Sequence, residues 1–202
     1  MRLDDWIEWA VCARPLAGEA VSGDVEVAAP CAGGVLLGAI DGLGHGPHAA
    51  EAANRARDVL LRAPADPLDT LVARCHDEMR HTRGAALALA FICRDGRLRW
   101  LGVGNVEAVV SHAAADGRRA RQSVMLLPGV VGQQIPRLRL AEVALSPGDM
   151  LVIATDGIRS MFLEALSSVD TPERTAQRIL AEYGKTTDDA LVLAAAYLRS
   201  GT

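Results

Sequence analysis

Short apolar runs separated by turn residues make up most of this chain, and they are interrupted by two blocks with helical periodicity. Alternation with a period of two, as in Val25-Glu26-Val27, and brief apolar runs between Gly, Pro, Asn and Asp residues are typical of strands. The dipeptide Gly104-Asn105 predicts a tight hairpin between two such runs. We predict strands over residues 6–13, 24–29, 34–40, 85–93, 97–103, 106–112, 139–145, 150–154 and 190–198.

Helical features occupy the segments between these strands. Pro47 suits the first turn of a helix, and residues 49–62 are rich in Ala, Glu, Arg and Leu. A second helix is predicted over 68–79 and should lie beside the first. Thr171 predicts the cap of a helix that ends at Tyr183, and a shorter helix is expected to begin at Ile158. Strands in hairpin order with helices inserted in two blocks favour antiparallel sheet packing over a doubly wound parallel sheet.

Composition limits the range of functions. A chain of 202 residues, half of them apolar, favours one domain over 1–202. The net charge of -4 and the scattered arginines give no basic stripe, which argues against nucleic acid as a partner. The acidic start is unlike a signal peptide, and no apolar run approaches membrane-spanning length. Four widely spaced cysteines are typical of free thiols in a reducing compartment. We therefore expect a cytoplasmic protein without a nucleic-acid or membrane partner.

The apolar run 34–40 leads directly into Asp41, which is the main candidate for chemistry. An ionised carboxylate at the end of a buried strand is costly unless it is paired or binds a cation. Asp24, Asp156 and Asp188 also stand at the edges of apolar strands. Turn preference alone explains any one of them, but four together favour convergence. Carboxylates without a set of histidines suit magnesium or manganese, and two such ions can activate a water for attack on a phosphate.

Glycines 42, 44 and 46 leave a second interpretation open, because a glycine cluster before a helix can cradle a phosphate. Its spacing, however, is not that of the dinucleotide fingerprint. His45 could protonate a leaving group, or it could be an ordinary hydrogen-bonded surface residue. Arg83 could hold a substrate phosphate, and Arg14 is a second candidate for that role.

Four motifs in order resemble the metal-dependent serine/threonine protein phosphatases of type 2C, the PPM family, over nearly the whole chain. They are Ser22-Gly23-Asp24, Asp41-Gly42-Leu43-Gly44-His45-Gly46, Thr155-Asp156-Gly157 and Asp188-Asp189. Within the family the chain is most similar to the bacterial sporulation and stress-response branch. The segments Arg83-Gly84-Ala85 and Gly102-Val103-Gly104-Asn105-Val106 resemble its small stand-alone stressosome phosphatases.

The resemblance implies an α+β fold of four layers, αββα, in which two antiparallel sheets form a sandwich flanked by helices. It also implies two divalent metal ions, Mn²⁺ or Mg²⁺, bridged by Asp41 and bound by the Gly42 carbonyl, with Asp156 and Asp188 completing the second position. Asp24 would hold the site directly or through a water. Leu43 stands where the animal enzymes carry a histidine, so the resemblance implies that the role of acid is vacant or passes to His45.

The leading hypothesis is therefore a protein phosphatase in which a metal-bridging hydroxide attacks phosphoserine or phosphothreonine. Its substrates would be phosphorylated scaffold or antagonist proteins of a bacterial stress-signalling pathway, such as a stressosome or an anti-sigma and anti-anti-sigma system. Two alternatives remain. One is an inactive phosphatase-like metal-binding module that acts by docking to a partner, and the other is a nucleotide-binding α/β domain.

Overall fold

Two β-sheets form the centre of the protein, in a computed structural model that describes residues 1–3, 5–114 and 116–199. The first sheet has the order β1-β2-β12-β11-β7-β8, and the second has the order β10-β6-β5-β4-β3 with β9 added in parallel beside β6. The first sheet comprises β1 (Arg2–Leu3), β2 (Ile7–Arg14), β7 (Glu107–Ala113), β8 (Arg119–Ser123), β11 (Met150–Ala154) and β12 (Ala190–Tyr197). The second comprises β3 (Asp24–Cys31), β4 (Gly34–Gly42), β5 (Ala85–Cys93), β6 (Arg97–Val103), β9 (Leu126–Leu127) and β10 (Ala141–Ala144).

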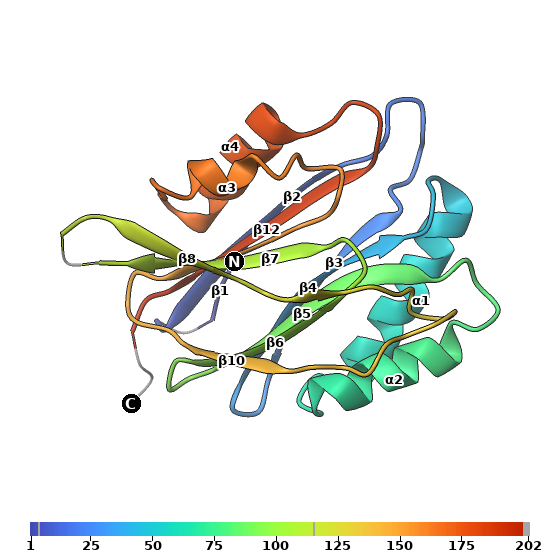
Figure 1. Cartoon of the computed structure of the whole chain (residues 1–202), viewed down its shortest axis with the longest axis horizontal. Coiled ribbons are helices and arrows are strands. Elements are labelled where there is room, and N and C mark those ends of the chain that lie inside the picture. Colours follow the sequence, from blue (N-terminus) through green and yellow to red (C-terminus); the bar gives the residue numbers. More distant parts are fainter. Residues whose placement is uncertain (4, 115, 200–202) are drawn as a thin grey trace.

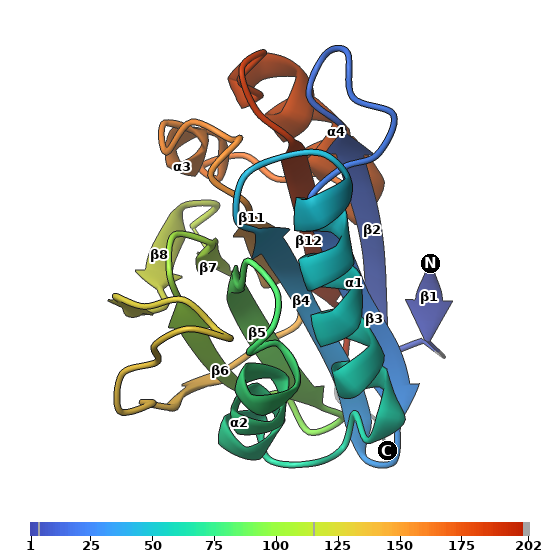
Figure 2. The same cartoon turned by 90° about the vertical axis from the view of Figure 1, so that its right-hand side faces the viewer.

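The helices cover the outer faces of the two sheets, so the molecule has four layers (Figures 1 and 2). Helices α1 (Pro47–Arg62) and α2 (Leu68–Glu78) pack on the second sheet. Helices α3 (Phe162–Ala165) and α4 (Pro172–Tyr183) pack on the first. The αββα sandwich predicted from the sequence is confirmed, and all its strand pairs are antiparallel except β6 with β9.

The central strands are apolar throughout because both of their faces are buried. In β12, Leu191 and Leu193 point into the core between the sheets, whereas Val192 and Ala194 pack against α3 and α4. In β4, Leu37 enters the core between the sheets and its neighbours pack under α1 and α2. An unbroken apolar run of this length is therefore what a four-layer sandwich requires of its inner strands.

The structure corrects one predicted hairpin. Residues 85–93 and 97–103 do form a hairpin, as predicted. The next pair does not, because β6 belongs to the second sheet and β7 to the first. The chain therefore crosses between the sheets at Gly104-Asn105, where Gly104 has a positive φ of 89°.

Several element boundaries also differ from the predictions. The helix expected from Ile158 begins at Phe162 and lasts one turn, and the strand expected over 139–145 is limited to Ala141–Ala144. Strand β8 was not predicted, because most of its side chains are exposed and charged or polar. The cap of α4 is as expected, since the Thr171 side chain accepts a hydrogen bond from the Arg174 amide.

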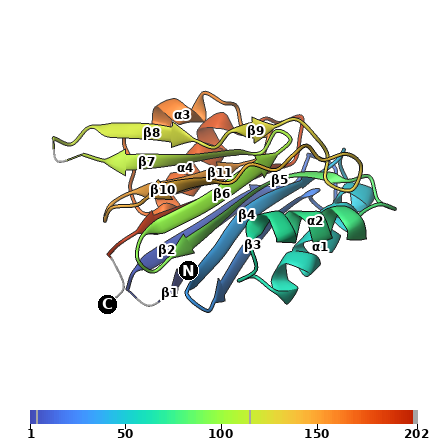
Figure 3. The same cartoon turned by 60° about the horizontal axis from the view of Figure 1, so that its bottom comes forward.

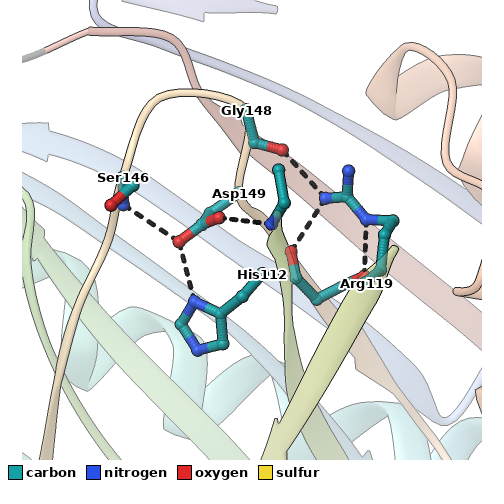
Figure 4. Close-up of polar contacts among 7 residues, drawn as sticks. His112, Arg119, Ser146, Gly148 and Asp149 are labelled. Carbon is teal, nitrogen blue, oxygen red and sulfur yellow. Dashed lines mark hydrogen bonds and ion pairs between the residues drawn. The ribbon is translucent and has the colours of Figure 1, made fainter. Parts of the chain in front are cut away.

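Polar contacts fasten the end of the first sheet where β11 begins (Figure 4). The Asp149 carboxylate, of which 1% is exposed, accepts hydrogen bonds from the amides of Ala113 and Ser146 and contacts His112 Nδ1 at 2.8 Å. Arg119 donates to the carbonyl of Gly148. These bonds tie the β7–β8 hairpin to the turn that leads into β11.

Both ends of the described chain meet at the same side of the sandwich (Figure 3). The Leu198 amide donates to the Trp6 carbonyl at 2.8 Å, and β2 pairs with β12 along its length.

The four cysteines are free, and burial raises the pKa of Cys75 to about 12. None of the described helices is long and apolar enough to cross a bilayer.

Candidate metal centre

Acidic residues from both sheets meet at one end of the sandwich. Asp24 begins β3 and is the register partner of Asp41 near the end of β4. Asp156 follows the end of β11, and Asp188 precedes the start of the neighbouring strand β12. Antiparallel pairing places the start of one strand beside the end of the next. Residues separated by more than a hundred positions are thereby brought together.

Asp24 lies behind the others, with 6% of its surface exposed. Its Oδ2 accepts a hydrogen bond from Thr155 Oγ1 at 2.6 Å, and the same hydroxyl accepts one from the Leu191 amide at 2.9 Å. Thr155, which directly follows β11, therefore links β3 of the second sheet to β11 and β12 of the first sheet. This threonine is part of the Thr155-Asp156-Gly157 motif, but nothing in the sequence indicated which side chain it would hold.

Three of the predicted acids line one cavity of about 350 Å³. Its walls are formed by Asp41, Leu43, Gly44, His45, Asn105, Asp156, Thr187 and Asp188. Asn105 was assigned to a hairpin turn from the sequence, yet its Nδ2 donates to Asp156 Oδ2 at 2.6 Å. The crossing of the chain between the sheets carries this amide to the cavity, and that crossing was not predicted.

Burial and mutual repulsion raise the pKa values of the acids. Burial, together with the nearby charge of Asp24 and three further aspartates, raises the pKa of Asp41 from 3.8 to about 8. Burial also raises the pKa of Asp24 to about 7, against the opposing hydrogen bond from Thr155. The pKa of Asp188 is raised as well, by burial and then by Asp156. A cluster of carboxylates in this state lacks the positive charge that would stabilise its ionised form.

The donor set fits a hard divalent cation. In the conformation described for residues 1–3, 5–114 and 116–199, no three His, Cys, Asp or Glu side chains are close enough to hold one ion together. The carboxylate oxygens that face the cavity are nevertheless the ligands that magnesium and manganese prefer. A bound cation would also offset the repulsion that raises their pKa values.

Asp189 has a different role from its neighbour Asp188. Its side chain accepts hydrogen bonds from the amides of Leu16 and Gly23, both at 2.8 Å, and it is 3% exposed. Both carboxylate oxygens are thus engaged by main chain. Asp189 fixes the loop that leads to Asp24, while Asp188 faces the cavity.

Gly42 allows α1 to approach the end of β4. A Cβ atom at this position would lie 2.1 Å from the Ala49 carbonyl oxygen, which no larger residue can tolerate. The Gly42 amide donates to the Gly23 carbonyl at 3.0 Å, so the loops before β3 and after β4 are joined. The glycine therefore has a packing role that is independent of any metal ligation by its carbonyl.

The remaining candidates lie around the rim. His45 lines the cavity, and its Nδ1 is 2.7 Å from Glu19 Oε1. The guanidinium of Arg83 lies against Gly44, since one of its nitrogens is 2.8 Å from the position of a Cβ there. Arg14 is directed elsewhere, because it donates to the Lys185 carbonyl. Arg14 thus holds a loop, and Arg83 stays beside the site.

Comparison with known families gives a match over most of the chain. The profile described as "Stage II sporulation protein E (SpoIIE)" matches residues 32–197. No curated protein sequence matches the chain. A solved structure described under "The bacterial stressosome: a modular system that has been adapted to control secondary messenger signaling" is 30% identical, with a TM-score of 0.85. That comparison covers 94% of this chain and 98% of the other.

Two further structures share the fold at lower identity. RsbX in complex with magnesium is 18% identical, with a TM-score of 0.87 over 97% of this chain and 98% of its own. The catalytic domain of the serine/threonine protein phosphatase PstP, in complex with 2 manganese ions, is 17% identical with a TM-score of 0.75. That comparison covers 96% of this chain and 99% of PstP.

Proposed function

Since this chain belongs to the SpoIIE family of type 2C phosphatases, we propose that it hydrolyses phosphoserine and phosphothreonine on proteins with the help of divalent metal ions. The observation that carries the proposal is the cavity that Asp41, Asp156 and Asp188 share at the end of the sandwich. We further propose that residues 1–202 form one phosphatase domain. Pairing of β2 with β12 supports this, because it joins segments from near both ends of the chain.

We assign the metal ligands to Asp41, Asp156, Asp188 and the Gly42 carbonyl, with Asp24 behind them. Mn²⁺ and Mg²⁺ are the candidate ions, since folds of this kind are known with manganese and with magnesium. Two ions bound there would polarise a phosphoryl group and activate a water for in-line attack. Thr155 would keep Asp24 in place through its hydrogen bond of 2.6 Å. Asn105 would orient the Asp156 carboxylate through the hydrogen bond that its Nδ2 donates.

His45 is the proposed acid for the serine or threonine leaving group. It lines the cavity, and the contact of its Nδ1 with Glu19 leaves Nε2 as the remaining ring nitrogen. A proton carried on this nitrogen is the one that would pass to the leaving oxygen. Leu43, two residues earlier and also on the cavity wall, has no proton to donate.

The proposed substrates are phosphorylated scaffold or antagonist proteins of a bacterial stress-signalling pathway. The support is a 30% identical structure described with the bacterial stressosome, together with a fold shared with RsbX and with 61% of a Mycobacterium tuberculosis structure of RsbU and RsbW domains. Free cysteines agree with a reducing compartment, and the cytoplasm is the proposed location.

The test is hydrolysis of p-nitrophenyl phosphate and of a phosphoserine peptide, with and without Mn²⁺ or Mg²⁺. Asp41→Asn and Asp156→Asn should each lower the rate by more than about a hundredfold, because even residues that only orient a metal ligand cost about 10–100-fold. Asp58→Asn is the matched control, since Asp58 is an exposed aspartate on α1 outside the cavity. It should keep the full rate.

Two outcomes would contradict the proposal. One is a wild-type protein that hydrolyses neither substrate with either metal. Such a result, combined with metal binding, would favour the alternative of an inactive module that docks to a partner. The other is full activity in both cavity variants, which would place the chemistry elsewhere in the molecule.

A further inference from the structure

A second cavity of about 450 Å³ shares a wall with the metal centre, and we call it the side cavity. Its lining consists of Asn105, Glu107, Leu126, Asp156, Ile158, Arg159, Ser160 and Lys185. Asn105 and Asp156 belong to both cavities, so the two spaces meet at this hydrogen-bonded pair. A molecule that places a phosphoryl group in the metal centre would therefore have its neighbouring atoms at the mouth of the side cavity.

One positively charged side chain in the lining of the side cavity, that of Arg159, has no structural role among the described residues. Lys185 donates through Nζ to the Asp156 carbonyl, and Glu107 accepts a hydrogen bond from Ser160 Oγ at 2.6 Å. The Arg159 side chain is exposed and has no hydrogen bond or ion pair with any residue that the structure describes. Its charge is therefore available to a ligand, because a guanidinium presents several N–H donors in a fixed plane.

One exposed apolar side chain lines the side cavity, and two more belong to chain neighbours of its lining residues. Leu126 lines it and is 38% exposed. Met125 and Met161, which are chain neighbours of lining residues, are exposed at 61% and 62%. Exposed methionines are typical of surfaces that adapt to polypeptide partners. These side chains thus favour a protein segment over a small inorganic anion as the occupant.

We propose that the side cavity binds an acidic side chain of the phosphoprotein, close in sequence to the phosphorylated residue, and that Arg159 determines this specificity. The inference rests on the proposed function. An arginine with free donors pairs best with a carboxylate, to which it can donate two parallel hydrogen bonds. Arg159 lines the side cavity but not the metal cavity, which favours a flanking carboxylate over the scissile phosphate as its partner.

The test uses pairs of phosphoserine peptides that differ only by Asp or Asn at each position within three residues of the phosphoserine. Wild-type protein should show kcat/KM about tenfold higher for the Asp peptide at one or more positions, the value expected of a charge-assisted hydrogen bond. Arg159→Gln should abolish this preference and leave hydrolysis of p-nitrophenyl phosphate unchanged. Arg159→Lys should retain part of it.

Two further measurements separate the inference from its alternatives. Anisotropy of labelled peptides in EDTA reports binding without turnover, and the ratio of the two Kd values should also depend on Arg159. Arg62→Gln is the matched control, because Arg62 is an exposed arginine at the opposite end of α1 from the metal centre. It should keep the preference.

The outcomes distinguish failure of the inference from failure of the function. Equal kcat/KM for both peptides in an active wild-type enzyme would overturn the side-cavity inference alone. A preference that survives Arg159→Gln would also overturn the assignment to this residue. Absence of all hydrolysis, with equal peptide binding, would overturn both the proposed function and the inference.

Discussion

Two kinds of aspartate in this protein differ in what surrounds their carboxylates. Asp149 and Asp189 are buried, and their carboxylates accept hydrogen bonds from main-chain amides. Asp41 and Asp188 face a cavity and repel each other and their acidic neighbours. The first kind stabilises the fold when ionised, whereas the second kind destabilises it until a cation is bound.

This difference predicts an unusual pH dependence for the metal-free protein. The folded state holds the pKa of Asp24 at about 7 and that of Asp41 at about 8, above their ordinary value of 3.8. The resulting contribution to stability is complete below pH 3.8 and is lost as the pH rises through 7 and 8. In EDTA, Asp41→Asn should therefore have a higher Tm than wild type at pH 9, by at least about 2–4 °C for each kcal/mol of repulsion removed.

The measurement is Tm by circular dichroism between pH 5 and pH 9 in EDTA. The difference between variant and wild type should shrink toward pH 5, where Asp41 is protonated in the folded wild-type protein and carries no buried, repelled charge. Asp58→Asn serves as the control, and its Tm should differ from wild type by a constant amount. A difference that is independent of pH for Asp41→Asn as well would contradict the shifted pKa values.

The aspartates of the candidate site were easier to predict from the sequence than the residues that hold them in place. Each of the predicted aspartates ends or begins an apolar strand, and a charge at such a position is visible in the sequence itself. Asn105 and Thr155 are ordinary turn and strand-end residues until the fold places them beside Asp156 and Asp24. Their partners lie on strands more than 50 positions away, so no local pattern could reveal them.

At the scale of elements, the β7–β8 hairpin depends on one buried carboxylate. Asp149→Ala removes the acceptor of two main-chain amides and the partner of His112. Hydrogen bonds to a charged group contribute about 1.5–3 kcal/mol each, so we expect a loss of about 3 kcal/mol in the free energy of unfolding. Urea denaturation followed by tryptophan fluorescence measures this loss.

The specific activity of the folded fraction should not change in Asp149→Ala, because Asp149 lies at the opposite end of β11 from Asp156. Asp116→Ala is the control, since Asp116 is exposed in the turn of the same hairpin and, among the residues that the structure describes, pairs only with Arg118. Loss of activity in the folded Asp149→Ala protein would show that the two ends of the sheet are coupled.

Strand identity was easier to predict than strand partnership. The apolar runs are long enough to mark β4, β5, β11 and β12 in the sequence. Which sheet each strand joins depends on contacts across the sandwich, and β6 and β7 look like a hairpin in every local respect. Strand β8 lacked a signal because its buried neighbours lie on β7 and its own side chains mostly face solvent.

For the whole molecule, metal binding should act on stability as well as on rate. A ligand at a hundred times its Kd stabilises the folded state by about 2.7 kcal/mol. Addition of Mn²⁺ or Mg²⁺ to EDTA-treated protein should therefore raise Tm by about 5–10 °C for a chain of this size. The rise should be larger at pH 8 than at pH 6, because the cation competes with protons for the carboxylates.

Differential scanning calorimetry measures this rise directly. Asp156→Asn should lose most of it, and sodium chloride at matched ionic strength should not reproduce it, since screening by salt is weaker than ligation. An equal rise in Asp156→Asn would show that the cations bind at another place.

The pairing of β2 with β12 sets the order of events during protein synthesis. Residues 7–14 are synthesised long before their sheet neighbours at 190–197. Asp188 directly precedes those late residues, whereas Asp24 and Asp41 are translated long before them. A nascent chain therefore holds β2 without its neighbour β12, and the candidate site without Asp188, until residues 188–197 have been made, and only then can the proposed metal centre form.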